Sequence, residues 1–331
     1  MKSTIYDVAH KAGVSIATVS KVINQTGRIS DKTRKLVTAV MKEMGYEPSM
    51  IASAMTRKST LTIGVLIPDL SNPFFASLAR SIEDRGHHLG YNIMICSTDY
   101  DPDKELKYIT LLKRKSVDGI ILVSGFEQTK MIADLISQGM PTVVVAREIP
   151  SLEVDTVSID NFLGGFQAAK HLLSLGHKKT AVITRDLWSN RERVRGFKQA
   201  LQEEGIELEQ DIKYATDSSL ENGRELACQL LESPDRPTAI FACDDPLAIG
   251  AVVAAREFGL SVPDQLSVIG FDDTIWAKVC FPPLTTIAQP LYDIGSAGMD
   301  LLVQEIKGQK SNKQRIILLP KLVIRESTMQ I

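Results

Sequence analysis

From Leu61 onward, short runs of β-branched residues alternate with amphipathic stretches, and this alternation restricts the fold more than any other feature. Strands that alternate with helices form parallel sheets with helices on both faces, a doubly wound α/β architecture. About 270 residues exceed one typical sheet, so we expect two lobes. The predicted strands are 62–67, 92–97, 119–123, 142–145, 180–184, 239–242 and 267–271, and the predicted helices are about 74–89, 103–113, 163–175, 193–204, 220–231 and 248–258.

The first 60 residues differ from the rest in charge and periodicity. They carry ten Lys and Arg against four Asp and Glu, whereas the remainder carries 28 against 36. Apolar residues at helical spacing predict three helices, at 5–12, from Ile16 to about Asn24 after an N-cap at Ser15, and from Ser30 or Asp31 to about Met44. Two short helices joined by a glycine-containing turn, with a third behind them, indicate an all-α helix-turn-helix domain.

The outward side chains of the second helix suit DNA. The hydroxyls of Ser15, Thr18 and Ser20 can bind phosphate oxygens. Lys21 can donate to guanine, while Ile16 and Ala17 can contact a thymine methyl group. A plain three-helix bundle with solvent-facing filler is the alternative interpretation. An exposed isoleucine would serve no purpose there, so the pattern favours DNA binding.

Two stretches of the head, 4–9 and 12–24, resemble the DNA-binding head of the lactose-repressor/galactose-repressor (LacI/GalR) family, and the likeness covers essentially the whole chain. It implies further backbone contacts from Thr4, Tyr6 and Asn24. The segment from Gly45 to Lys58 looks like the family's hinge helix, which implies minor-groove contacts from Ala52, Met55 and Arg57. Two departures bear on the mechanism: Lys21 stands where the family usually has Arg, and Met55 stands where it has a wedging Leu.

The resemblance also implies the domain organisation. A helix-turn-helix domain would span 1–47, a hinge helix and linker 48–60, and a periplasmic-binding-protein-like effector and dimerisation domain 61–331. The chain would cross between lobes near 160, 290 and 320, which gives lobe one about 61–160 and 291–321, and lobe two about 161–290 and 322–331. A small-molecule effector would bind in the cleft at the carboxyl ends of the strands.

Candidate effector-binding residues follow these strand ends. Ser71, Phe74 and Phe75 come after the first strand, and one aromatic ring could stack on a sugar while the other packs in the core. Asp272 follows the strand 267–271, and its carboxylate can accept from hydroxyls. Arg193 matches the family's ligand-binding arginine. The remaining candidates are Arg147, Asp244, which stands where the family commonly has Asn, and Trp276, which could line the cleft or simply pack.

Other classes of protein fit less well. The sequence has no phosphate-binding loop, nucleophile elbow or pair of histidines at metal-ligand spacing, so we expect neither an enzyme nor a cofactor or metal site. The four cysteines show no metal-ligand or redox spacing. The start lacks a secretory signal, and no apolar run is long enough to span a membrane. We therefore expect a cytoplasmic protein rather than an exported sugar-binding protein.

The sequence predicts a transcription regulator, most simply a repressor, that binds a near-palindromic operator in double-stranded DNA as a homodimer. Its effector would be a sugar or sugar derivative. One alternative is a global carbon-catabolite-type regulator controlled by a phosphoprotein, because 291–295 resembles the docking segment of such regulators; Asp300, however, stands where they have a phosphate-binding Arg. Other stretches, notably 24–34, 95–102 and 285–290, resemble the degradation-activator (DegA-like) subgroup.

Overall fold

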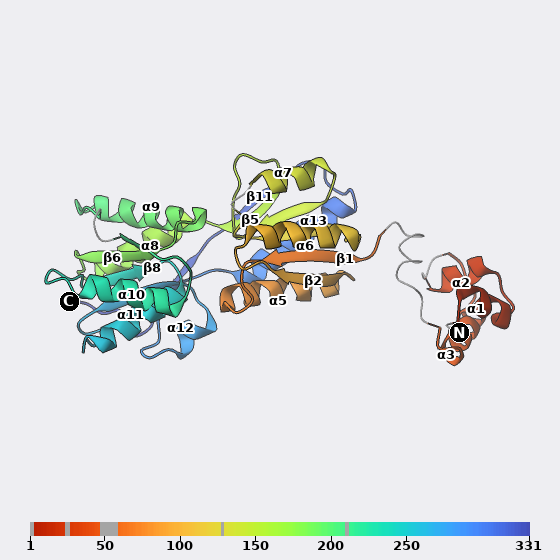
Figure 1. The fold of residues 1–331 in the computed structure, drawn as a ribbon, viewed down its shortest axis with the longest axis horizontal. Helices are drawn as coiled ribbons and strands as arrows, with labels where there is room; N and C mark the ends of the chain where they lie inside the picture. Colours follow the sequence, from red (N-terminus) through yellow and green to blue (C-terminus); the bar gives the residue numbers. More distant parts are fainter. Residues whose placement is uncertain (1–2, 24–26, 47–58, 127–128, 209–211) are drawn as a thin grey trace. The chain divides into compact units, whose positions relative to one another are not determined.

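The computed structural model describes residues 3–23, 27–46, 59–126, 129–208 and 212–331. The chain forms two compact units, residues 1–62 with 116–118, and residues 63–115 with 119–331 (Figure 1). No helix among the described residues is long and apolar enough to cross a membrane. The predicted hinge residues and Asn24 lie outside the described ranges.

The head contains the three predicted helices, α1 (Ile5–Ala12), α2 (Ile16–Ile23) and α3 (Asp31–Glu43). Local signals set their limits. Thr4 and Asp7 form a capping box at the start of α1, and Gly13 ends it with a φ of 64°. Ser15 and Ser30 accept the amide protons of the residues three positions on. The core consists of Val8, Ala9, Ala12, Val19, Val22, Val37 and Val40.

The body contains two six-stranded sheets, which confirms the predicted doubly wound, two-lobed fold. The first has the order β11-β5-β4-β3-β1-β2, with β1 Thr62–Ile67, β2 Asn92–Ser97, β3 Gly119–Val123, β4 Thr142–Val145, β5 Asp155–Ile159 and β11 Arg315–Leu318. The second has the order β12-β10-β9-β8-β6-β7, with β6 Thr180–Thr184, β7 Ile212–Tyr214, β8 Ala239–Ala242, β9 Ser267–Asp272, β10 Thr285–Ala288 and β12 Lys321–Val323. In this second sheet, β12 runs antiparallel to β10.

Helices cover both sheets (Figure 1). Those of the first lobe are α5 (Pro73–His88), α6 (Pro102–Arg114), α7 (Thr129–Ser137) and α13 (Leu291–Ile306). Those of the second lobe are α8 (Asn161–Ser174), α9 (Trp188–Gln202), α10 (Leu220–Leu231), α11 (Asp245–Glu257) and α12 (Ile275–Val279). The chain passes between the sheets three times, from β5 to α8, from β10 to α13 and from β11 to β12.

The sequence reading missed several elements. Strands β5, β7, β10, β11 and β12 and helices α7 and α12 were not expected. Strand β5 was missed because it carries polar residues, which are typical of exposed segments. Its Asp155 is nevertheless fully buried, and the amide proton of Gln314 and the ammonium group of Lys310 compensate for the loss of water. Helix α9 begins at Trp188, not at Arg193. The sequence does not signal this start because Leu187 at the N-cap offers no side-chain cap.

A glycine contact joins α8 to α9. A Cβ on Gly165 would lie 1.8 Å from the carbonyl oxygen of Arg193, and one on Gly196 would lie 1.9 Å from that of Phe162. Only glycine allows two backbones to approach so closely. The contact fixes the position of Arg193 at the edge of the second sheet.

Candidate DNA-binding surface and effector pocket

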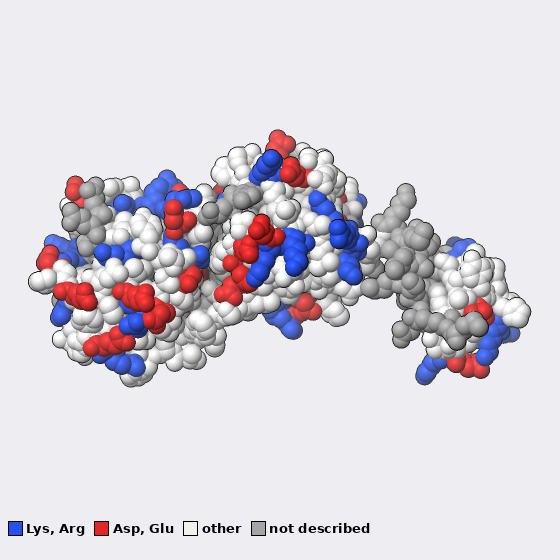
Figure 2. All heavy atoms as spheres, viewed as in Figure 1, with Lys and Arg blue, Asp and Glu red and all other residues white. Residues whose placement is uncertain are grey.

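The predicted base-reading residues lie on an exposed part of α2. Ile16 is 41% exposed, and Ala17 and Lys21 are exposed one helical turn apart. Ser15 caps the helix, and its hydroxyl lies 2.9 Å from that of Thr18. Tyr6 is exposed on α1, whereas the Thr4 hydroxyl donates to Asp7. On the face seen in Figure 2, acidic and basic side chains are interspersed over the body.

A small cavity of about 40 Å³ lies between the two lobes, at the carboxyl ends of their strands. Residues after β1 to β4 line one side, and residues after β5 to β10 line the other. The lining residues are Asn72, Phe74, Phe75, Tyr100, Ser124, Ala146, Asn161, Leu187, Ser189, Asn190, Arg193, Ser218, Asp244, Asp272 and Gln289. The structure therefore brings five predicted effector residues together: Phe74, Phe75, Arg193, Asp244 and Asp272.

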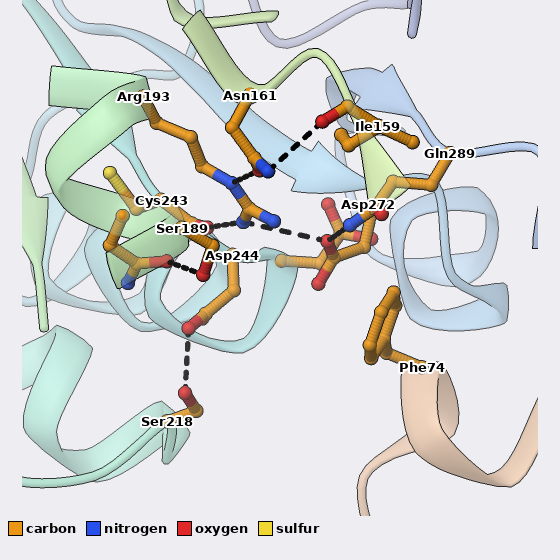
Figure 3. Close-up of polar contacts among 12 residues, drawn as sticks. Phe74, Ile159, Asn161, Ser189, Arg193, Ser218, Cys243, Asp244, Asp272 and Gln289 are labelled. Carbon is orange, nitrogen blue, oxygen red and sulfur yellow. Dashed lines mark hydrogen bonds and ion pairs between the residues drawn. The ribbon is translucent and has the colours of Figure 1, made fainter. Parts of the chain in front are cut away.

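Arg193 is held on several sides, and only 6% of it is exposed. Its Nε donates to Asn161 Oδ1 at 2.9 Å and its Nη1 donates to the Cys243 carbonyl at 2.5 Å (Figure 3). Nη1 also lies 3.7 Å from Asp272 Oδ1, and the guanidinium carbon lies 3.6 Å from the centre of the Phe271 ring. These contacts fix the direction of the guanidinium group before any ligand binds.

Asp272 ends β9 with a φ of 114°, in the region that favours glycine. Its Oδ1 accepts from Gln289 Nε2 at 2.6 Å. Burial raises the pKa of the Asp272 carboxyl, and the nearby Arg193 opposes this rise. The strained backbone thus presents a buried acceptor to the cavity.

Two further carboxylates lie at the start of α11. Asp244 is its N-cap, accepting from Leu247 N at 2.9 Å and from the Ser218 hydroxyl at 2.7 Å. Burial raises the pKa of Asp244. Asp245, fully buried behind it, accepts three hydrogen bonds from Thr274 and Thr286, and burial raises its pKa to about 7.

A contact between the lobes involves Tyr100, which lines this cavity. The guanidinium carbon of Arg185, which follows β6, lies 4.4 Å from the centre of the Tyr100 ring, which follows β2. Arg185 also donates to the Ser218 hydroxyl at 3.3 Å. Phe75 packs edge-on against both Phe74 and Tyr100, with ring centres 5.0 and 6.4 Å apart. Both phenylalanines are buried and both line the cavity, so the structure does not assign one of them to the core and the other to the pocket.

The remaining predicted effector residues lie elsewhere. Arg147 lines a neighbouring outer cavity of about 220 Å³ together with Asp186 and Arg191, and it donates to the Phe126 carbonyl. Ser71 is exposed, and its hydroxyl donates to Asp69. Trp276, 39% exposed, lines a third cavity that Ser71 shares. Both of these cavities adjoin the inner one: the cavity of Arg147 shares Ser124, Leu187 and Ser189 with it, and the cavity of Trp276 and Ser71 shares Asn72 and Ser218.

Sequence reasoning missed several residues of the inner cavity. Asn161 and Gln289 follow β5 and β10, two strands that the sequence analysis did not predict. Had these strands been predicted, both residues would have been candidates, because ligands bind at the carboxyl ends of parallel strands. Asn190 lies in the first turn of α9, upstream of the predicted start. Tyr100 lacks a sequence signal of its own, because its role depends on the facing lobe.

Comparison with known proteins agrees with this architecture. Residues 4–49 match the model of bacterial regulatory proteins of the lacI family, and residues 169–328 match that of a periplasmic binding protein-like domain. The chain is 49% identical to the HTH-type transcriptional regulator DegA of Bacillus subtilis over 99% of this chain and 98% of that protein. It is 37% identical to catabolite control protein A of Priestia megaterium, over 99% of this chain and 100% of that protein.

A solved structure of the Lac repressor dimer, bound to operator and the anti-inducer ONPF, has a TM-score of 0.89 and 29% identity, covering 99% of this chain and all of that one. These relatives are regulators rather than enzymes, and the similarity to DegA confirms the subgroup resemblance. The chain belongs to the lacI family of bacterial DNA-binding transcription regulators.

Proposed function

We propose that this protein is a repressor that binds a near-palindromic operator as a homodimer, with a DNA affinity set by a sugar or sugar derivative bound between its lobes. The observation that carries the effector site is the buried arrangement of Arg193, Asp272, Asn161 and Gln289 at converging strand ends. Guanidinium, amide and carboxylate groups together can bind several hydroxyls, and Phe74 offers an apolar face for a ring.

The small size of the cavity supports a mechanism in which effector binding changes the arrangement of the lobes. About 40 Å³ is far below the ~300–1,000 Å³ of common ligand pockets, so a ring-sized effector requires the lobes to separate or the outer cavity to join the inner one. The two cavities share Ser124, Leu187 and Ser189. A ligand that binds one arrangement of the lobes more tightly shifts the population towards it.

On the DNA side, we propose that Ile16, Ala17 and Lys21 contact base edges and that Ser15, Thr18, Ser20, Thr4, Tyr6 and Asn24 contact the backbone. We assign Ala52, Met55 and Arg57 of the predicted hinge to the minor groove, with Met55 as the wedge. Such a regulator would work in the cytoplasm, where the chromosome is.

We assign the dimer contact to an apolar surface of lobe two. A cavity of about 430 Å³ borders this surface, lined by Leu220, Ile249, Trp276, Val279 and Cys280 of lobe two and also by Asp69, Ser71 and Asn72 of lobe one, and 69% of Val279 is exposed. Apolar surface of this kind marks interaction sites. A second copy is its occupant because the similar Lac repressor structure is that of a dimer. Helix α13 is less suitable as the contact, because it packs Ile294, Met299 and Leu302 into the core of lobe one.

We expect Val279→Asp to break this contact, because a charge would be buried without a partner. Sedimentation of the full chain at micromolar concentration should change from dimer to monomer, and operator affinity should fall by more than about tenfold. The control is Leu106→Asp, an exposed position on α6 of lobe one. An unchanged dimer in Val279→Asp would show that this surface is not the interface.

The phosphoprotein alternative gains no support from the contacts around Asp300. Its carboxylate lies 2.7 Å from Arg85 Nη2, so the pair is locally neutral where a phosphate would need a net positive charge.

The effector proposal is tested by the thermal unfolding of the full chain with sugars, sugar acids, sugar phosphates and nucleobases. A ligand at 100 times its Kd stabilises the folded state by about 2.7 kcal/mol, and the midpoint rises accordingly. The rise should vanish in Arg193→Ala and persist in Arg195→Ala, an exposed arginine on the same helix. A rise that survives Arg193→Ala would place the effector elsewhere.

A further inference from the structure

We propose that the effector carries a positively charged amino group that Asp244 binds, so that its chemical class is the amino sugars. The inference rests on the proposed effector site and specifies which compounds that site takes. It goes beyond the binding of hydroxyls because Asp244 adds a negative charge to the cavity that hydroxyls alone do not require.

The charges around the cavity do not balance. Asp244 and Asp272 both line it, and Asp245 lies fully buried directly behind. Arg193 pairs with Asp272. Arg185 reaches Asp244 only through the Ser218 hydroxyl, which accepts from Arg185 and donates to Asp244 Oδ2. Among the described residues, the lining of the cavity therefore has two carboxylates, Asp244 and Asp272, and one arginine, Arg193, which forms an ion pair with Asp272 and not with Asp244.

Asp244 itself has only neutral partners. Its Oδ1 accepts from the Leu247 amide and its Oδ2 from the Ser218 hydroxyl, and among the described residues no cation lies within ion-pair distance of either oxygen. A buried carboxylate without a cation is costly. Burial raises the pKa of Asp244, and Arg193 and Arg185, which lie beyond ion-pair distance, oppose this rise without cancelling it. An ammonium group brought by a ligand would supply the missing charge.

The fold does not need this charge. Asparagine caps helices as well as aspartate does, because its side-chain oxygen can accept the Leu247 amide proton. Its amide nitrogen could then donate to the Ser218 hydroxyl in place of the present contact. The negative charge of Asp244 therefore matters for whatever occupies the cavity that it lines. In Figure 3 its carboxylate points towards Ser218, which is another lining residue.

The hydrogen-bonding capacity of Asp244 also favours an amine. An ammonium group has three donors and no acceptor, whereas Asp244 is an acceptor only, so the two are complementary in charge and in hydrogen bonding. The outer cavity is different, since Arg147 and Arg191 outnumber Asp186 there. The test compounds should therefore carry no anionic group, which the outer cavity could bind independently.

The test is isothermal titration of the full chain with three matched pairs: glucose and glucosamine, galactose and galactosamine, mannose and mannosamine. We expect at least one amino sugar to bind about 10–100-fold more tightly than its neutral parent, as for a charge-assisted hydrogen bond in a buried site. Asp244→Asn should remove this preference, so that the ratio of the two affinities within each pair falls to about one, because a neutral side chain no longer distinguishes an ammonium group from a hydroxyl. The preference in the unaltered protein is measurable whether or not the variant folds.

The outcomes separate the two proposals. Equal affinity within every pair, or an equal loss for both members in Asp244→Asn, would overturn the amino-group inference. If only compounds without an amine bind through Arg193, the inference fails and the effector site stands. If none of the six compounds binds, the amino-group inference fails, and the effector site is then decided by the wider thermal-unfolding panel with Arg193→Ala.

Discussion

At the scale of single residues, the same side-chain types have different roles because their surroundings differ. Arg193 is buried against Phe271 and points into the cavity, whereas Arg195, two residues on, is exposed and pairs with Glu192. Lys21 is exposed on α2, and its aliphatic stem lies near Gly27, 3.4 Å from where a Cβ would be. A supported stem leaves the ammonium group free to reach a base edge.

We expect Lys21→Ala to lower affinity for a selected operator while affinity for random DNA changes little, because a good base contact discriminates by about 1–3 kcal/mol. Fluorescence anisotropy at several salt concentrations measures both affinities. Arg57→Ala is the comparison, and should weaken binding to all DNA and reduce the salt slope by about one. An equal loss on both DNAs for Lys21→Ala would assign the lysine to the backbone.

At the scale of elements, the second lobe depends on helices that touch at glycines. Gly165 and Gly196 bring α8 and α9 together, and Gly223 and Gly250 do the same for α10 and α11, where a Cβ would lie 2.4 and 2.3 Å from carbonyl oxygens of the facing helix. The neighbouring atoms belong to backbone, which cannot rotate away. These helices carry Arg193 and Asp245, so their spacing also sets the geometry of the cavity.

Gly196→Ala should therefore destabilise the protein by about 1–3 kcal/mol or more, the usual cost of overpacking. Urea unfolding followed by circular dichroism measures the loss. Gly86→Ala is a matched helical control, because its Cβ would meet the flexible end of Ile93 and should cost less. Equal stability of the two variants would contradict this account of the α8–α9 contact.

At the scale of the whole body, the contact between Arg185 and Tyr100 joins lobe two to lobe one. Such cation–π contacts contribute about 0.5–2 kcal/mol. A contact present only when the lobes are close stabilises that arrangement, and a ligand that also needs close lobes then binds more tightly. Under the proposed mechanism, Tyr100 would couple effector affinity to the separation of the lobes.

We expect Tyr100→Ala to weaken binding of an identified effector by about 2–30-fold, which corresponds to the loss of that contact. Small-angle scattering of the ligand-free protein should give a larger radius of gyration. Tyr214→Ala, at an exposed tyrosine of β7, is the control. Unchanged affinity and radius would mean that the lobes are held by other contacts.

The sequence by itself determined the head and most of the central strands. Helix limits at Thr4, Gly13, Ser15 and Ser30 depend on hydrogen bonds within three or four residues, so the sequence contains the whole signal. Strands such as β1 and β3 are continuous apolar runs that are buried on both faces. Arg193 was predicted as an effector-binding residue from the family resemblance.

Only the tertiary structure decided the rest. Strand β11 pairs Arg315 with Thr156, so its existence depends on a segment some 160 positions away in the sequence. Because β5 and β10 were not predicted, Asn161 and Gln289 were not found. The division of the strand-end residues among adjoining cavities depends on how loops and helices pack over the strand ends. Local patterns specify elements because their interactions are local, whereas a site assembled from two lobes depends on contacts between residues that no short pattern connects.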